Sequence, residues 1–315
     1  MIIKLFCDTS CVLMVFCCFL FRGCLSMSYG LPYMGSKNLY AKQLCSVLPN
    51  GKRLVDLFAG GCAITDCAIR EYSDRWETFL VNDINPEPLD LYAKCLCGNN
   101  PASYEWVTRE EFKHADFATK LVWSFGNNLD KYIFGKDIEP LKHDLEEWLV
   151  SGTVLGLSGI FDDVELPELS SRQERMAWWK EHKKELPRIN VRANRLEQIG
   201  RLDRLQLENF ARLELLERLE FSYLSYEQYE YRYGDVVYCD IPYRDTYCVQ
   251  YKANKGGFNH DAFWEWAKSC PFDVYVSERT LPYDVNAEIL FQRDIPKRAS
   301  DKGSTGHVTE YLVRV

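Results

Sequence analysis

The stretch Arg53-Leu-Val-Asp-Leu-Phe-Ala-Gly-Gly-Cys62 predicts a short buried strand that runs into a glycine turn, and a helix-like segment, residues 63–72, follows it. Strand, glycine turn and helix in this order are typical of α/β proteins with parallel strands and right-handed crossovers. The two glycines let a ligand approach the backbone and leave the first N–H groups of the helix open. Because Gly60 and Gly61 are adjacent and no third glycine follows, the stretch does not match the Gly-x-Gly-x-x-Gly pattern of dinucleotide-binding strands.

A second strand is expected over residues 78–81, followed by a helix over 87–97. The strand ends on Asn82-Asp83-Ile84-Asn85-Pro86. An acid at this place can bind the ribose hydroxyls of a nucleoside-like cofactor. The same residues are also good turn formers, so the alternative that Asp83 only caps the next helix stays open.

Strand patterns resume after a long interval that is rich in Trp, Glu, Lys and Arg. We predict that residues 27–98 and 219–315 form one α/β sheet domain, and that residues 99–218 form an inserted, mainly helical domain. The later strands are expected at residues 219–223, 235–239, 272–277, 287–291 and 308–315, and the helices of the insertion at 138–149, 171–184, 191–199 and 202–219.

The stretch Asp240-Ile-Pro-Tyr243 directly follows a hydrophobic strand. It places a carboxylate, a rigid backbone and an aromatic ring at the carboxyl end of that strand. These groups suit a planar amine: Asp240 and the carbonyl of Ile241 can each accept one N–H, and Tyr243 can stack on the base. An ordinary Asp/Pro turn is the alternative, but it does not account for the aromatic ring.

These motifs resemble those of a known enzyme family. Asp240-Ile-Pro-Tyr243 resembles the Asp-Pro-Pro-Tyr signature of DNA amino-methyltransferases, and Asp56-Leu-Phe-Ala-Gly-Gly61 resembles their S-adenosylmethionine loop. Upstream, Tyr33-Met-Gly-Ser-Lys37 is similar to the Tyr-x-Gly-Gly-Lys opening motif of the Dam-like DNA adenine (N6) methyltransferases of phages and bacteria. The motifs stand in the family's order, and the resemblance covers residues 32–85 and 221–315.

The resemblance implies a Rossmann-like methyltransferase sheet with an inserted target-recognition domain, and S-adenosylmethionine as cofactor. It implies that the catalytic residues are Asp240, Ile241, Pro242 and Tyr243, and that the cofactor-binding residues are Tyr33, Lys37, Asp56, Phe58, Ala59, Gly60 and Asp83. Three positions depart from the pattern: Ile241 replaces a proline, Ser36 replaces a glycine, and Ser225 stands where an acid often binds the adenine of the cofactor.

The resulting hypothesis is a site-specific transferase that methylates N6 of a flipped adenine in double-stranded DNA. The alternatives are an N4-cytosine, RNA or protein-amide methyltransferase with the same site, or a non-catalytic DNA-binding module. We expect a cytoplasmic monomer without a membrane association or a bound metal, and a cognate restriction endonuclease is a candidate partner.

The charge of the chain bears on DNA contact. With 38 Lys and Arg against 46 Asp and Glu the net charge is −8, so any contact with nucleic acid must be local. Residues 171–218 contain twelve basic and eight acidic residues, a local excess of +4. We predict phosphate contacts at Arg188, Arg192 and Arg195, on one helical face, and at Lys302 in a second basic loop. Solvated helix faces with ion pairs four residues apart are the alternative.

The first 26 residues have a character of their own. They hold five of the thirteen cysteines and an apolar run, residues 12–21, that is too short for a membrane-spanning helix. A signal peptide is the literal interpretation. We expect instead that residues 1–26 lie outside the fold, that Met27 is the natural start, and that the other cysteines are free thiols.

Overall fold

The computed structural model describes residues 28–183, 194–206, 214–244, 257–296 and 306–315. Within these ranges, no helix combines the length and the apolar character that crossing a membrane requires. The cysteines in the same ranges are free.

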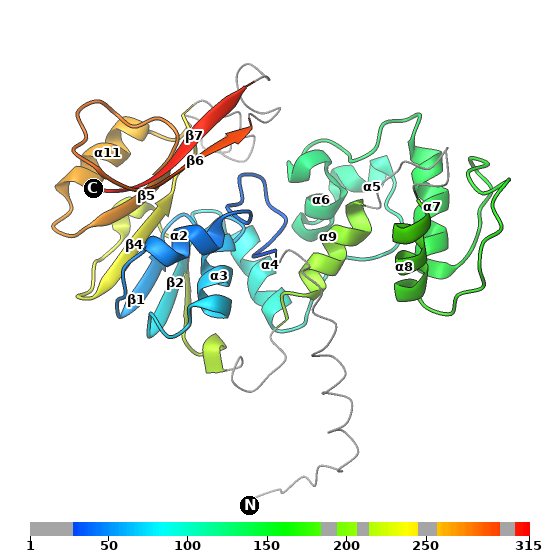
Figure 1. Ribbon diagram of the computed structural model, residues 1–315, viewed down its shortest axis with the longest axis horizontal. Helices are drawn as coiled ribbons and strands as arrows, with labels where there is room; N and C mark the ends of the chain where they lie inside the picture. Colours follow the sequence, from blue (N-terminus) through cyan, green and yellow to red (C-terminus); the bar gives the residue numbers. More distant parts are fainter. Residues whose placement is uncertain (1–27, 184–193, 207–213, 245–256, 297–305) are drawn as a thin grey trace, which may run out of the picture.

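One seven-stranded sheet organises the molecule, in the order β3-β2-β1-β4-β5-β7-β6 (Figure 1). The strands are β1 (Arg53–Asp56), β2 (Thr78–Asn82), β3 (Leu219–Ser222), β4 (Asp235–Asp240), β5 (Val274–Glu278), β6 (Glu288–Pro296) and β7 (His307–Arg314). The first five are parallel, as expected, whereas β7 runs antiparallel to both β5 and β6. The segment between β6 and β7, residues 297–306, is shorter than the crossover of a dozen or more residues that parallel pairing needs. The α/β, Rossmann-like fold class is confirmed.

Both faces of the sheet are buried. On one face, Leu54 and Tyr238 belong to a hydrophobic cluster with α2 (Ala41–Val47), α3 (Ala63–Glu71) and α4 (Pro86–Leu96). On the other face, Val55 and Val237 pack with α11 (His260–Ser269). Neighbouring residues of one strand enter opposite clusters because side chains alternate along a strand. The sheet is therefore the middle layer of three, as in other parallel sheets.

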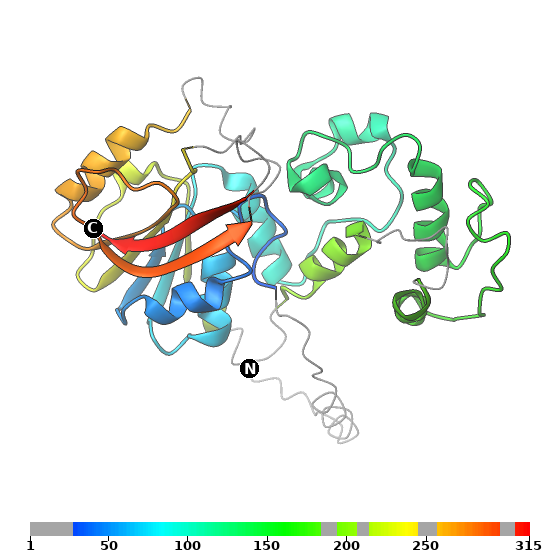
Figure 2. The ribbon, with the colours of Figure 1, turned by 45° about the horizontal axis from the view of Figure 1, so that its top comes forward.

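The chain between β2 and β3 is mainly helical, as expected. Its helices lie beyond α4 on one side of the sheet, and α7 and α8 lie farthest from it (Figures 1 and 2). They are α5 (Arg109–His114), α6 (Phe117–Trp123), α7 (Glu139–Ser151), α8 (Arg172–His182) and α9 (Asn194–Asp203), with the short 3-10 helix η2 (Phe125–Asn127) after α6.

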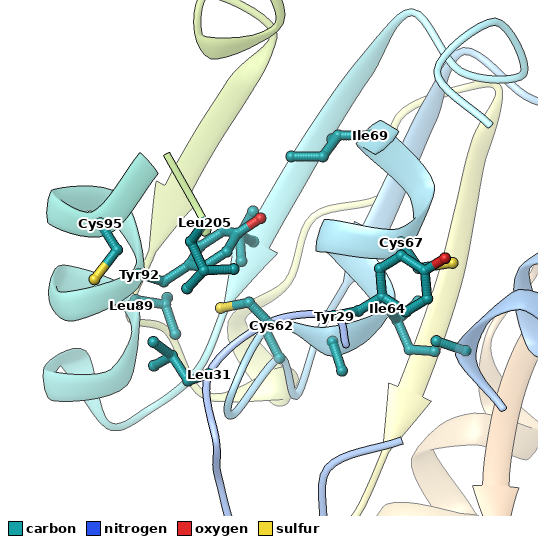
Figure 3. Close-up of a cluster of buried hydrophobic side chains, with 14 of the residues drawn as sticks. Tyr29, Leu31, Cys62, Ile64, Cys67, Ile69, Leu89, Tyr92, Cys95 and Leu205 are labelled. Carbon is teal, nitrogen blue, oxygen red and sulfur yellow. The ribbon is translucent and has the colours of Figure 1, made fainter. Parts of the chain in front are cut away.

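The hydrophobic core continues from the sheet into these helices. Phe112 of α5 and Leu121 of α6 belong to the same cluster as Leu89 of α4. Figure 3 shows Leu205, which follows α9, beside Tyr92 of α4. A separate cluster joins α7 and α8, through Trp148 and Trp179, to Leu196 of α9. The extent of the inserted domain thus stays a prediction, because apolar packing does not break at residue 98.

Candidate active site

The site lies where the strand order reverses. β2 and β3 extend the sheet on one side of β1, and β4 and β5 extend it on the other. In such sheets, ligands bind beyond the carboxyl ends of the strands at this point. The backbone N–H of Leu57, just after β1, donates to the carbonyl of Tyr238 in β4 at 2.9 Å. The glycine turn and the Asp240–Tyr243 motif therefore begin side by side.

The glycine turn is packed against the opening motif. Gly60 has a φ of +47°, a conformation that favours glycine. A Cβ atom on Gly61 would lie 2.5 Å from the Cβ of Tyr33, and the N–H of Leu31 donates to the carbonyl of Gly61 at 2.7 Å. The second glycine thus makes room for protein, a role that sequence reasoning did not foresee. Tyr33 lies over the turn, with its ring 3.5 Å from the position of a Cβ on Gly60.

Asp83 connects the end of β2 to this turn. Its carboxylate accepts the N–H of Gly60 at 2.8 Å and the N–H of Asn85 at 2.9 Å. The cap of α4 is Asn85, whose side chain accepts the N–H of Glu87, so the alternative that Asp83 caps this helix is wrong. Burial raises the pKa of Asp83, and the two N–H groups oppose this rise. Each carboxylate oxygen keeps a lone pair that can accept a hydroxyl group.

The turn also contains or adjoins Asp56, Phe58 and Ala59, which were predicted to bind the cofactor. Each of them lines or supports the turn. Asp56 is enclosed and accepts hydrogen bonds from the N–H and the hydroxyl of Thr65, at 3.3 and 2.7 Å. Burial raises the pKa of Asp56 to about 7. Asp56 therefore supports the turn through Thr65, and its predicted contact with the cofactor stays a prediction. The ring of Phe58 lies 5.7 Å from that of Phe263, and the N–H of Ala59 donates to the carbonyl of Asn82.

Lys37 lies beside Asp240, and its predicted contact with the cofactor stays a prediction. Its ammonium is buried, with 3% of the residue exposed, and it forms an ion pair with Asp240. It also lies 3.3 Å from a carboxylate oxygen of Glu310 and 4.6 Å from the centre of the Tyr243 ring. Lys37 thus belongs to the group around Asp240, while Tyr33 of the same opening motif covers the glycine turn.

The residues of the Asp240–Tyr243 motif are held by different elements. Burial raises the pKa of Asp240 to about 6, although Lys37 opposes this rise. Ile241 is buried in the cluster on the α11 face of the sheet, so its side chain is accommodated where the family pattern has a proline. The carbonyl of Pro242 lies 2.6 Å from Nε2 of His260, and the hydroxyl of Tyr243 donates to Glu310.

Sequence reasoning missed three residues here. Glu310 of β7 is 2% exposed, and the guanidinium of Arg279 lies 4.6 Å from the centre of the Tyr243 ring. Glu278 is buried at the end of β5, and burial raises its pKa to about 7. Glu310 could have been found from the sequence because it lies two residues before the apolar Leu312 in a predicted strand. The two positions share a face of the sheet, so an acid is expected to be buried there.

Known proteins share the first part of this arrangement. The family model of the D12 class N6 adenine-specific DNA methyltransferases matches residues 33–122. This range contains the opening motif, the glycine turn and Asp83.

This part of the chain is similar to that family.

A relative, the Retron Ec67 DNA adenine methylase of Escherichia coli, is 38% identical over 68 residues, which are 22% of this chain and 22% of the relative. The alignment thus spans about a fifth of the length of the curated relative. The predicted resemblance to Dam-like adenine methyltransferases is confirmed over residues 33–122.

One departure from the D12 pattern is now visible in its surroundings. Ser225, where an acid was expected, begins the short 3-10 helix η3 (Tyr226–Gln228). Its hydroxyl lies 3.2 Å from a carboxylate oxygen of Glu227, and its N–H donates to the side chain of Gln228. An acidic group is therefore present beside Ser225, two positions later in the chain.

The predicted phosphate contact of Arg195 is wrong. Arg195 is 1% exposed, and its Nε lies 2.6 Å from a carboxylate oxygen of Glu146. Its other nitrogens donate to the carbonyls of Ser103 and Tyr104. The guanidinium is buried between α9 and α7, which it joins through Glu146, so it cannot reach DNA. The other predicted contacts, Arg188, Arg192 and Lys302, lie outside the described residues.

Proposed function

We propose that this protein is a DNA methyltransferase that methylates N6 of adenine with S-adenosylmethionine as the methyl donor. The match of residues 33–122 to the adenine-specific methyltransferase family supports the reaction class. The observation that carries the proposal is the position of the Asp240 carboxylate, which lies at the end of β4 beside the glycine turn and in contact with a buried ammonium. This arrangement combines a hydrogen-bond acceptor for an amine with an adjacent nucleoside site.

The residues of the turn fit the cofactor. Asp83 offers two oxygens with free lone pairs, which suit the two hydroxyls of a ribose. Gly60 presents its backbone beside the ring of Tyr33, with no side chain between them, and Ala59 precedes it with a small side chain. When bound, S-adenosylmethionine supplies an electrophilic methyl group on a sulfonium. Asp83, Ala59, Gly60 and Tyr33 would hold it, and Asp56 and Phe58 would support them.

The amine of adenine is a weak nucleophile because its lone pair is delocalised into the ring. Asp240 and the carbonyl of Ile241 would accept hydrogen bonds from its two N–H groups, favour a tetrahedral nitrogen and stabilise the positive charge that develops on it. The nitrogen would bond to the methyl carbon as the carbon–sulfur bond of the donor breaks, and it would then lose one proton to water. The buried setting of Asp240 strengthens these contacts relative to water. Tyr243 would stack on the target base once it leaves the duplex, a step that costs a few kcal/mol.

The remaining assignments follow from this activity. We infer that residues 99–218 supply target recognition, and that Arg188, Arg192 and Lys302 contact phosphates. A monomer acting on double-stranded DNA, alone or beside a restriction endonuclease, fits a site that is built from one chain.

The experiment is methyl transfer from labelled S-adenosylmethionine to unmethylated duplex DNA, followed by analysis of the nucleosides. We expect N6-methyladenine, whereas labelled N4-methylcytosine, or label only in RNA or protein, would refute the adenine assignment. Asp240→Ala should lower the transfer rate by roughly 100- to 1,000-fold and leave the cofactor affinity, measured by calorimetry, unchanged. The control is Asp284→Asn, since Asp284 only pairs with the surface residue Lys268 at 2.8 Å.

A further inference from the structure

Glu310 faces two of the groups that the reaction would use. One of its carboxylate oxygens, Oε1, accepts the hydroxyl of Tyr243 and lies 3.3 Å from the ammonium of Lys37. Lys37 in turn contacts Oδ1 of Asp240. One buried ammonium thus serves two carboxylates, only one of which belongs to the Asp240–Tyr243 motif.

This sharing matters because the proposed reaction asks Asp240 to change partners. An oxygen that holds Lys37 is less available to the amine of the base. Lys37 is almost fully buried, so its ammonium would be strongly destabilised if no carboxylate stayed beside it. With Glu310 beside it, the ammonium keeps a carboxylate partner when Asp240 turns away.

Tyr243 depends on the same atom. Lys37 and Arg279 both lie 4.6 Å from the centre of its ring, so cations approach the surface that would stack on a base. The bond from the hydroxyl to Glu310 fixes the far end of the ring. A shift of Lys37 toward Glu310 would move the ammonium while the ring stays tethered.

We propose that Glu310 is a positioning residue that retains Lys37 and Tyr243 while the Asp240 carboxylate turns from Lys37 to the amine of the target base. This inference rests on the proposed function. Glu310 touches neither the base nor the cofactor in this scheme, and it acts through Lys37 and Tyr243.

The ionisation of Glu310 agrees with this role. Burial alone would raise the pKa of Glu310. Lys37 and the hydroxyls of Tyr243 and Tyr40 instead hold this pKa below its usual value. Glu310 therefore stays negative at pH values where Asp240 begins to protonate. Its charge raises the pKa of Asp240, and Lys37 and Arg279 lower it. The other acids that interact with Asp240 are Asp56 and Glu278.

The test is Glu310→Gln, which keeps the shape and an oxygen for Tyr243 but removes the charge. We expect kcat for a DNA duplex to fall by roughly 10- to 100-fold, since a misplaced reacting group has effects of this size. The affinity for S-adenosylmethionine should not change. Because a negative charge near Asp240 is lost, the acidic fall of the pH–rate profile should move to lower pH.

A matched control is Thr309→Val, the preceding residue of β7. The hydroxyl of Thr309 donates to the exposed Asp294 at 2.6 Å, away from the site. The kcat and pH profile of the Thr309→Val variant should therefore equal those of the wild type. Glu310→Asp, which restores the charge, should return the acidic fall toward the wild-type pH.

Three outcomes would overturn the inference: an unchanged kcat in Glu310→Gln, an equal loss at every pH, or a loss that follows a lowered melting temperature alone. A wild-type protein that transfers no methyl group to DNA would refute the proposed function instead. In that case, a carbon-13 NMR titration of Asp240 in the wild type and in Glu310→Gln still tests whether the charge of Glu310 changes the pKa of Asp240. An unchanged Asp240 pKa there would refute the coupling.

Discussion

Asp240 is subject to opposing influences at the scale of single residues. Burial raises its pKa to about 6, while Lys37 and Arg279 work in the opposite direction. The ionised carboxylate is the form that pairs with Lys37 and that would turn to the amine of the target base. The balance between burial and the neighbouring cations would therefore set the pH range of the proposed reaction.

We expect kcat/KM to fall as the pH is lowered through about 6, because Asp240 becomes protonated there. Lys37→Met removes a cation that lowers the Asp240 pKa, so this fall should move to higher pH. A pH–rate profile between pH 5 and 8 for both proteins measures the shift. A profile for Lys37→Met that falls at the wild-type pH, or lower, would contradict the coupling.

Arg195→Met should destabilise the protein, because it leaves the buried Glu146 carboxylate without its partner. The free energy of unfolding should fall by about 3–5 kcal/mol, and Glu146→Leu in the same chain should restore much of it. Denaturant unfolding gives the comparison. The control is Lys113→Met, since Lys113 forms only an exposed pair with Glu110 and should unfold like the wild type.

Short segments outside the strands shape the site at the scale of elements. The glycine turn after β1 is held from two directions, by Asp83 from β2 and by residues 31–33 from the opening motif. Asn82 adds a third tie, because its side chain donates to the carbonyls of Leu57 and Leu224, which follow β1 and β3. The carboxyl ends of three strands are thus fixed together before any ligand binds.

Gly61→Ala should disturb this arrangement, since its Cβ would lie 2.5 Å from the Cβ of Tyr33 and 3.3 Å from the carbonyl oxygen of Leu31. Overpacking of this kind costs about 1–3 kcal/mol, and displacement of Tyr33 should weaken S-adenosylmethionine binding as well. Calorimetry and thermal unfolding measure the two effects. Gly135→Ala is the control, because its Cβ would meet nothing within 4 Å. Equal behaviour of the two variants would argue against the packing role of Gly61.

The helical region and the sheet are connected at the scale of the whole molecule. Arg201 of α9 donates to the carbonyl of Gly30 at 3.0 Å, and the next residue, Leu31, donates to Gly61 in the turn. If the proposed binding of DNA shifts α9, this shift would be transmitted to the segment that covers the glycine turn. The net charge of −8 also requires that any contact with DNA be confined to part of the surface.

This confinement predicts how DNA affinity depends on salt. If Arg192 and Lys302 contact phosphates, Arg192→Ala and Lys302→Ala should each reduce the slope of log K against log salt by about 1. Arg195→Met should leave the slope unchanged, because Arg195 is paired inside the protein. Fluorescence titrations of a labelled duplex at several salt concentrations compare the three. A flattened slope for Arg195→Met would contradict its buried role.

The sequence by itself determined the α/β class, the order of the motifs and the resemblance to the methyltransferase family, because strand patterns, glycine turns and short motifs are local. The start and end of a helix were harder to predict: the helix expected over residues 202–219 is wrong at its start, since α9 covers residues 194–203. Only the tertiary structure decided that Lys37 faces Asp240, that Glu310 joins them from an antiparallel strand, and that Arg195 is buried. These relations join residues far apart in the chain, and the pairing of buried charges depends on which elements pack together.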